Sequence, residues 1–280
     1  MSKVFADDLL AGKVAYIAGG TRGMNLAIAK RYAAHGAKVT VMSRNPERCA
    51  KAQAELEALG TEAMGLPADA RDYDRVAETI AQTAERFGPI DIVVAGQAGN
   101  FYAPVNGMSS NGFKAVIDID LVGTFNVWKA SYEHLRRPGA SLIAITAPEA
   151  VRPLHFQAHV CAAKAGVNML MRVLALEWGP KGVRVNGISP GPIEGSWGMA
   201  NVASPNQAIV DKITAAIPLK RWGQESDIAD TALFLASPAS SYITGTIIET
   251  DGGVTIASPE GAEIDSLGDL SKDPRVRGRG

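Results

Sequence analysis

The stretch Ala18-Gly19-Gly20-Thr21-Arg22-Gly23-Met24-Asn25 decides the fold of this chain. It follows a strand-like run at residues 13–18, and an amphipathic helix is expected to begin near Arg22. Gly19 and Gly23 let the backbone turn tightly and approach a pyrophosphate, while the free N–H groups at the start of the helix point at the phosphates. The stretch therefore predicts a dinucleotide cradle between a first strand and a first helix.

The residues after the second expected strand, 38–42, select between the two nicotinamide dinucleotides. An NAD site would place an Asp or Glu there, but this chain has Ser43 and Arg44. A carboxylate would repel a 2′-phosphate, whereas Arg22 and Arg44 offer permanently charged donors to it. We predict NADP(H) as the cofactor. The alternative is that both arginines are ordinary solvated surface charges.

The composition limits the classes of protein to which this chain can belong. The chain has 280 residues, of which 46% are hydrophobic and 20% charged, enough for one large α/β domain, which we place at residues 1–256. A tail at 257–280 mixes both charge signs. The net charge of −1 gives no basic stripe for a nucleic-acid backbone, so a small-molecule substrate is favoured.

The sequence carries no metal, disulfide or targeting signal that we recognise. Cys49 and Cys161 are far apart and lack metal-ligand spacing, and the histidines show no such spacing either, so we predict reduced thiols and no metal. No apolar run is expected to span a membrane. The end Gly278-Arg279-Gly280 differs from an S-K-L peroxisomal address. We expect a soluble, cytoplasmic protein.

The chain alternates strand and helix along its length. Beyond the first two strands and the first helix, the expected helices are 46–59, 72–87, 110–136, 157–178 and 225–236, and the expected strands are 63–66, 90–95, 141–145, 183–188 and 245–249. Strands separated by helices imply right-handed crossovers. The predicted fold is α/β, a single doubly wound Rossmann domain with a seven-stranded parallel sheet and helices on both faces.

Ligands of such sheets lie beyond the carboxyl ends of the strands. The residues that we expect to contact the cofactor lie there or in the glycine turn, and they are Gly19, Thr21, Arg22, Gly23, Met24, Ser43, Arg44, Asp69, Ala70, Ala95, Gly96, Pro190, Gly191 and Ile193.

Over residues 9–254 the chain resembles the short-chain dehydrogenase/reductase family. The resemblance rests on the glycine turn, Asp69, Lys164, Asn186 ahead of residues 190–193, the stretch 218–223, and Gly245 through Asp251-Gly252-Gly253. Three cofactor-side positions depart from the family pattern. The usual Thr before the first glycine is Ala18, the third glycine is Asn25, and the usual Asn-Asn-Ala-Gly reads Ala95-Gly96-Gln97-Ala98.

Larger departures fall on the family's catalytic positions. The tyrosine one helical turn before the lysine is Val160, the usual serine is Ala147, and the usual asparagine is Asp120; only Lys164 remains. The resemblance implies that Lys164 binds the nicotinamide ribose and brings positive charge to the reacting end. Losing the tyrosine, a general acid, removes the proton source for an alkoxide, so a simple ketone or alcohol substrate is disfavoured.

Local patterns resemble one branch, the NADPH-dependent 2,4-dienoyl-CoA reductases of the peroxisomal type. These patterns are Gly99-Asn100-Phe101, Asp118-Ile119-Asp120 with residues 123–127, residues 190–195, and His159 five residues before Lys164. The resemblance implies hydride transfer to the distal end of a dienoyl thioester, with charge collecting on the thioester oxygen and water delivering the proton. It also implies an acyl-CoA substrate and a homotetramer.

The same resemblance assigns further roles, each with a structural alternative. Asp120 and Asp251 would share an acid or water-positioning role, and Asn100, Phe101 and His159 would contact the substrate. Asp251 could instead be a structural residue ahead of the Gly252-Gly253 turn. His159 could simply pack at the start of its helix, and Phe101 could be a core residue.

Two other functions stay open at this stage. The first is a carbonyl or alcohol oxidoreductase in which Asp120, His159 or Tyr102 replaces the lost tyrosine. The second is an inactive NADP-binding scaffold or sensor. Ala95, Ala147 and Val160 favour it, whereas Lys164 and the complete cofactor loops oppose it.

Overall fold

Strand β1 (Val14–Ala18) is buried along its whole length and divides the core in two. In this computed structural model, which describes residues 4–196 and 206–257, Ala15 and Ile17 belong to one hydrophobic cluster. Val14, Tyr16 and Ala18 belong to the other. Successive side chains of a strand point to opposite faces. The expected first strand is therefore the centre of a sheet that is covered on both sides.

All seven predicted strands form one parallel sheet in the order β3-β2-β1-β4-β5-β6-β7, which confirms the predicted doubly wound fold. The strands other than β1 are β2 (Lys38–Ser43), β3 (Ala63–Pro67), β4 (Ile92–Ala95), β5 (Ser141–Ile145), β6 (Arg184–Pro190) and β7 (Ile247–Thr250). The strand order reverses direction between β1 and β4, and a ligand crevice is expected there, at the carboxyl ends of the strands.

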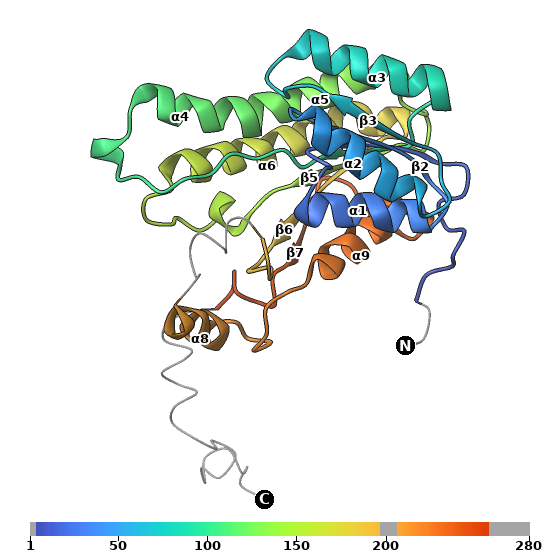
Figure 1. Cartoon of the computed structure of the whole chain (residues 1–280). Helices are drawn as coiled ribbons and strands as arrows, with labels where there is room; N and C mark the ends of the chain where they lie inside the picture. Colours follow the sequence, from blue (N-terminus) through green and yellow to red (C-terminus); the bar gives the residue numbers. More distant parts are fainter. Residues whose placement is uncertain (1–3, 197–205, 258–280) are drawn as a thin grey trace, which may run out of the picture.

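Helices cover the sheet in two layers (Figure 1). Helices α1 (Gly23–Ala34), α2 (Pro46–Glu57) and α9 (Glu225–Ala236) bury apolar residues in the first cluster. Helices α3 (Tyr73–Phe87), α5 (Gly123–Ser131) and α6 (Ala158–Trp178) do so in the second. Side chains cap α2 and α3 locally: Asn45 accepts from Arg48 N at 2.8 Å, and Asp72 accepts from Arg75 N at 3.1 Å.

The prediction of one continuous helix at 110–136 was wrong. Helix α4 (Ser110–Ile117) passes into a π-helical turn, Asp118–Val122, before α5 begins, and a 3₁₀ turn follows at Tyr132–His134. The Thr124 hydroxyl donates to the Asp120 carbonyl at 2.6 Å, within the widened turn. A π-helical turn inserted in a helix often accompanies a functional position, and here it carries Asp120.

Two further differences concern helices. Helix α8 (Gln207–Ala216) was not predicted, and none of its residues is buried. The helical stretch Ala158–Lys181 is long and apolar enough to cross a membrane by length and composition alone, contrary to the sequence expectation. Half of its most apolar window is buried, and α6 packs against the sheet through Val167, Met171 and Leu174, which is the arrangement of a core helix.

Candidate active site

A cavity of about 1260 Å³ lies at the carboxyl ends of the strands. The glycine turn and the ends of β2, β3, β4, β5 and β6 line it. One bound ligand usually occupies roughly 300–1,000 Å³, so this cavity has room for a cofactor and a second molecule. Both ligands would meet where the strand order reverses.

The glycine turn makes one wall of the cavity and fits a pyrophosphate. Gly19 has φ +73°, and a Cβ built there would lie 2.8 Å from the backbone nitrogen of Gln97. Helix α1 begins after Arg22 with no side chain capping its first N–H groups. Uncapped N–H groups and the positive end of the helix dipole favour an anion, so the residues present fit a dinucleotide.

Arginines gather at the adenosine end of the cavity. Arg22, Arg44 and Arg48 line it, and within residues 4–196 and 206–257 they form no ion pair. Asp69, at the end of β3, is held by Arg71 at 2.6 Å, and this hydrogen bond is the main reason that the Asp69 pKa is lowered. The sequence analysis missed Arg48, although it lies only three residues beyond the cap Asn45.

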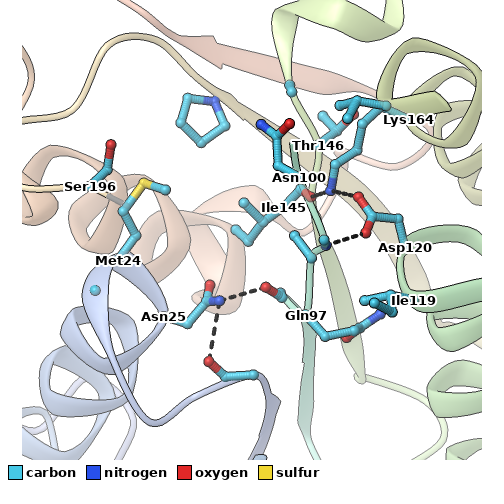
Figure 2. Close-up of a pocket in the computed structure, with 18 of the residues that line it drawn as sticks. Met24, Asn25, Gln97, Asn100, Ile119, Asp120, Ile145, Thr146, Lys164 and Ser196 are labelled. Atoms are coloured by element: carbon cyan, nitrogen blue, oxygen red, sulfur yellow. Dashed lines mark hydrogen bonds and ion pairs between the residues drawn. The ribbon is translucent and has the colours of Figure 1, made fainter. Parts of the chain in front are cut away.

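A buried ion pair lies at the part of the cavity where the sequence predicts the reaction, which we call the reacting end. Lys164 on α6 is 6% exposed and Asp120 is 1% exposed, and Lys164 Nζ lies 3.1 Å from Asp120 Oδ2. Lys164 also donates to the Ile145 carbonyl at 3.0 Å, while Asp120 Oδ1 accepts from Gly99 N at 2.7 Å (Figure 2). An ammonium has three donors, so Lys164 keeps one for a ligand in the cavity.

The residues at the family's tyrosine and serine positions are apolar, and both lie at the cavity. Val160 and Ala147 both line the cavity. The neighbouring hydroxyl, on Thr146, donates to Asn168 Oδ1 at 2.6 Å. Tyr102 lines the cavity but is 46% exposed, and burial together with the Glu149 charge raises its pKa. None of these side chains reproduces an acidic tyrosine beside Lys164.

The expected substrate residues separate into two layers. Asn100 lines the cavity, and its side-chain oxygen accepts from Gln157 Nε2 at 3.0 Å. Phe101 lies outside the lining and packs on His159 with the ring centroids 4.3 Å apart. His159 is fully buried, both ring nitrogens lack a hydrogen-bond partner of good geometry among the described residues, and burial lowers its pKa against the opposing Asp120 charge. Contact with substrate is therefore supported only for Asn100.

Asp251 lies outside the cavity lining. Its carboxylate accepts from Gly253 N at 2.8 Å and from Thr255 N at 2.7 Å. Burial works to raise its pKa, but hydrogen bonds from Thr255 and Gly253 outweigh burial and lower it. These contacts favour the structural alternative for Asp251, a turn-forming carboxylate.

Most of the expected cofactor residues meet in the cavity. The lining includes every one of them except Ala95 and Ile193, namely Gly19, Thr21, Arg22, Gly23, Met24, Ser43, Arg44, Asp69, Ala70, Gly96, Lys164, Pro190 and Gly191. Ala95 is buried in β4, and Ile193 packs in the core. The sequence analysis did not single out Asn25, Gln97 and Gln157 as lining residues. In the sequence, Asn25 was noted only because the family pattern has glycine at that position.

Comparisons with known proteins agree with this geometry. A family model described as enoyl-(acyl carrier protein) reductase matches residues 18–255. The chain is 38% identical over 270 residues to a peroxisomal 2,4-dienoyl-CoA reductase of Pongo abelii, covering 96% of this chain and 91% of the relative. It is 36% identical over 289 residues to the enzyme of that name from Arabidopsis thaliana, covering 100% and 96%. Both names give (3E)-enoyl-CoA as the product.

A solved structure shows the same fold. The short chain dehydrogenase from Bacillus anthracis superposes with a TM-score of 0.78 at 34% identity, covering 87% of this chain and 96% of that one.

The buried ion pair generates a testable prediction. Lys164→Met removes one charge and leaves Asp120 buried and unpaired, which typically costs about 3–5 kcal/mol of unfolding free energy. Adding Asp120→Leu to Lys164→Met removes the second charge, and the double variant should recover most of that loss. Urea unfolding measures both. Equal stabilities of the single and double variants would show that the pair is not electrostatically coupled.

Proposed function

The chain belongs to the short-chain dehydrogenase/reductase family, and we propose that it is an NADPH-dependent reductase of 2,4-dienoyl-CoA thioesters. The observation that carries the proposal is the reacting end of the cavity, where Val160 and Ala147 replace an acid and a hydroxyl, while Lys164 is retained and forms a buried ion pair with Asp120. The relatives named 2,4-dienoyl-CoA reductase, which match nearly the whole chain, support the same substrate class.

The chemistry of a dienoyl thioester suits this arrangement. An NADPH held by the glycine turn, Arg22 and Arg44 would supply a hydride, and the hydride would join C5, at the far end of the diene. The C4=C5 and C2=C3 double bonds become C3=C4 and C1=C2, and the π electrons of the C1 carbonyl move to the thioester oxygen, which becomes negatively charged. A proton then joins C2, which gives the 3-enoyl thioester named for the relatives. No alkoxide forms, so no tyrosine-like acid is needed.

Three side chains would carry out the protein's part. The free Lys164 N–H binds the nicotinamide ribose and places positive charge near the developing oxyanion. Because Gln157 donates to the Asn100 oxygen, the Asn100 amide N–H groups are left for the thioester oxygen. Asp120 orients Lys164 and a water that delivers the proton. We give Asp251 no part in this step because its carboxylate is held by two backbone N–H groups.

Cofactor choice is part of the proposal. Arg22 and Arg44 line the adenosine end with no carboxylate at position 43, and Arg48 adds a third positive charge. These charges favour a 2′-phosphate. The two relatives described above are named peroxisomal, so the cytoplasmic location stays a prediction for this chain. The homotetramer also stays a prediction.

The function is tested by turnover. With NADPH, the protein should reduce hexa-2,4-dienoyl-CoA and leave a panel of ketones unreduced, since the site lacks an acid for an alkoxide. NADPH absorbance gives the rates, and the position of the remaining double bond follows from NMR of the product. Faster turnover of a ketone would support the carbonyl alternative, and no turnover of any substrate would support the scaffold.

The proton-delivery role of Asp120 makes a second prediction. Asp120→Asn keeps the shape but removes the charge, so kcat should fall about 10²-fold while the dissociation constant for NADPH changes little. The matched control is Asp118→Asn, in the same π-helical turn but paired with Lys114, which should keep the parent kcat. If the Asp120 variant matched the parent across the pH profile, the carboxylate would have no part in proton delivery.

The cofactor assignment makes a third prediction. Arg44→Ala should weaken NADPH binding by roughly 10- to 100-fold, because charge-assisted hydrogen bonds contribute about 1.5–3 kcal/mol, and it should leave NADH binding unchanged. Calorimetric titration measures both constants. Arg31→Ala, which breaks a pair with Asp230 away from the cavity, is the control. Equal affinities of the parent for NADPH and NADH would refute the 2′-phosphate site.

A further inference from the structure

Two backbone loops pack directly against each other in the wall of the cofactor cavity. One is the glycine turn after β1, and the other follows β4 at Gly96 and Gln97. A Cβ on Gly19 would lie 2.8 Å from Gln97 N, 2.9 Å from Gln97 Cα and 3.0 Å from the Gly96 carbonyl carbon. Because both loops line the cavity, their separation sets the shape of the wall that a dinucleotide would touch.

The side chain of Asn25 bridges these loops. From the first turn of α1 its Nδ2 donates to the Gly96 carbonyl at 2.6 Å and lies 3.4 Å from the Gly19 carbonyl (Figure 2). Two carbonyl acceptors on one side fix which end of the amide carries nitrogen. The Asn25 oxygen is buried without a partner among the described residues. The side chain is therefore held by its donor end, and chiefly by Gly96.

Gly96 is the necessary partner of that side chain. A Cβ at Gly96 would lie 2.4 Å from Asn25 Oδ1 and 2.5 Å from both Asn25 Cγ and Nδ2, so an alanine there would force the Asn25 amide out of its place. The backbone of Gly96 is not in the left-handed region, so conformational strain does not require glycine there. Space for the Asn25 amide requires it.

The two positions are also departures from the family pattern in the sequence. The family has glycine where this chain has Asn25, and it has asparagines in the loop where this chain has Ala95-Gly96. The structure brings the added amide and the missing side chain into contact.

We propose that Asn25 is a positioning residue for the cofactor, and that Gly96 is its coupled partner. The Asn25 amide holds the Gly96 carbonyl against the glycine turn and so keeps the phosphate-binding turn and the β4 loop at the separation that a dinucleotide requires. The inference rests on one part of the proposed function, the binding of a dinucleotide. It does not depend on which acyl substrate is reduced.

The test is a double-mutant cycle read by binding. Asn25→Ala removes the bridge at a helical position where alanine is favourable, and Gly96→Ala displaces the Asn25 amide. Each single variant should raise the dissociation constant for NADPH about 5- to 20-fold, as expected for the loss of one short hydrogen bond. In the double variant the methyl group added at position 96 has room, so the combined effect should be well below the product of the two single effects.

A buried asparagine away from the cavity supplies the control. Asn186 on β6 also donates to a backbone carbonyl, that of Ile243 at 2.9 Å, and it does not line the cavity. Asn186→Ala should lower the melting temperature and leave the NADPH dissociation constant unchanged. Calorimetric titration well below the melting temperature, with the melting temperature measured in parallel, separates positioning from stability.

Two results would overturn the proposal. The first is an Asn25→Ala variant that melts earlier but binds NADPH within twofold of the parent, because the bridge would then be structural only. The second is a double variant whose effect equals the product of the singles, because Asn25 and Gly96 would then be independent. Binding is measured without substrate, so failure of dienoyl-CoA turnover leaves the test intact. If the parent prefers NADH, the titrations use NADH.

Discussion

The buried ammonium of Lys164 is the interaction on which the reacting end of the molecule depends. A charge that is 6% exposed must have its N–H groups matched by acceptors, because a bare buried ion is costly. The acceptors come from β5, through the Ile145 carbonyl, and from the π-helical turn, through Asp120. Asp120 in turn binds Gly99 N after β4. One side chain on α6 thus ties together three neighbouring segments and fixes where a ligand can lie.

The presence of this pair is informative about function. Replacing a buried ion pair with apolar residues is often neutral or stabilising, so a scaffold that had lost its chemistry would have little reason to bury both charges. The positions around the pair, Val160 and Ala147, have become apolar. A site with a fixed positive charge, and with no tyrosine-like acid among the described residues, suits a reaction that collects negative charge on an oxygen and takes its proton from water.

The fold followed from the sequence because every strand is followed by a turn or helix signal and the sheet is buried on both faces. The site was only partly accessible from sequence. Asn100 and Phe101 are neighbours, yet one lines the cavity and the other packs on His159, and sequence spacing cannot tell which side chain faces inward. The π-helical turn at Asp120 was hidden because apolar residues continue on both sides of it. Asp251 occupies a family position, but its role depends on backbone N–H groups that only the folded chain brings to it.

The departures from the family pattern are of two physical kinds, and the folded structure is needed to tell them apart. At the cofactor wall, the side chain missing from Gly96 is offset by the amide of Asn25, so the geometry is kept by different residues. At the reacting end none of the described residues offsets the loss of the tyrosine and serine. Thr146 is committed to Asn168, and Tyr102 has a raised pKa beside Glu149. Offset departures preserve a function, whereas departures without a replacement mark the place where the chemistry differs, and here that place is the proton donor to oxygen.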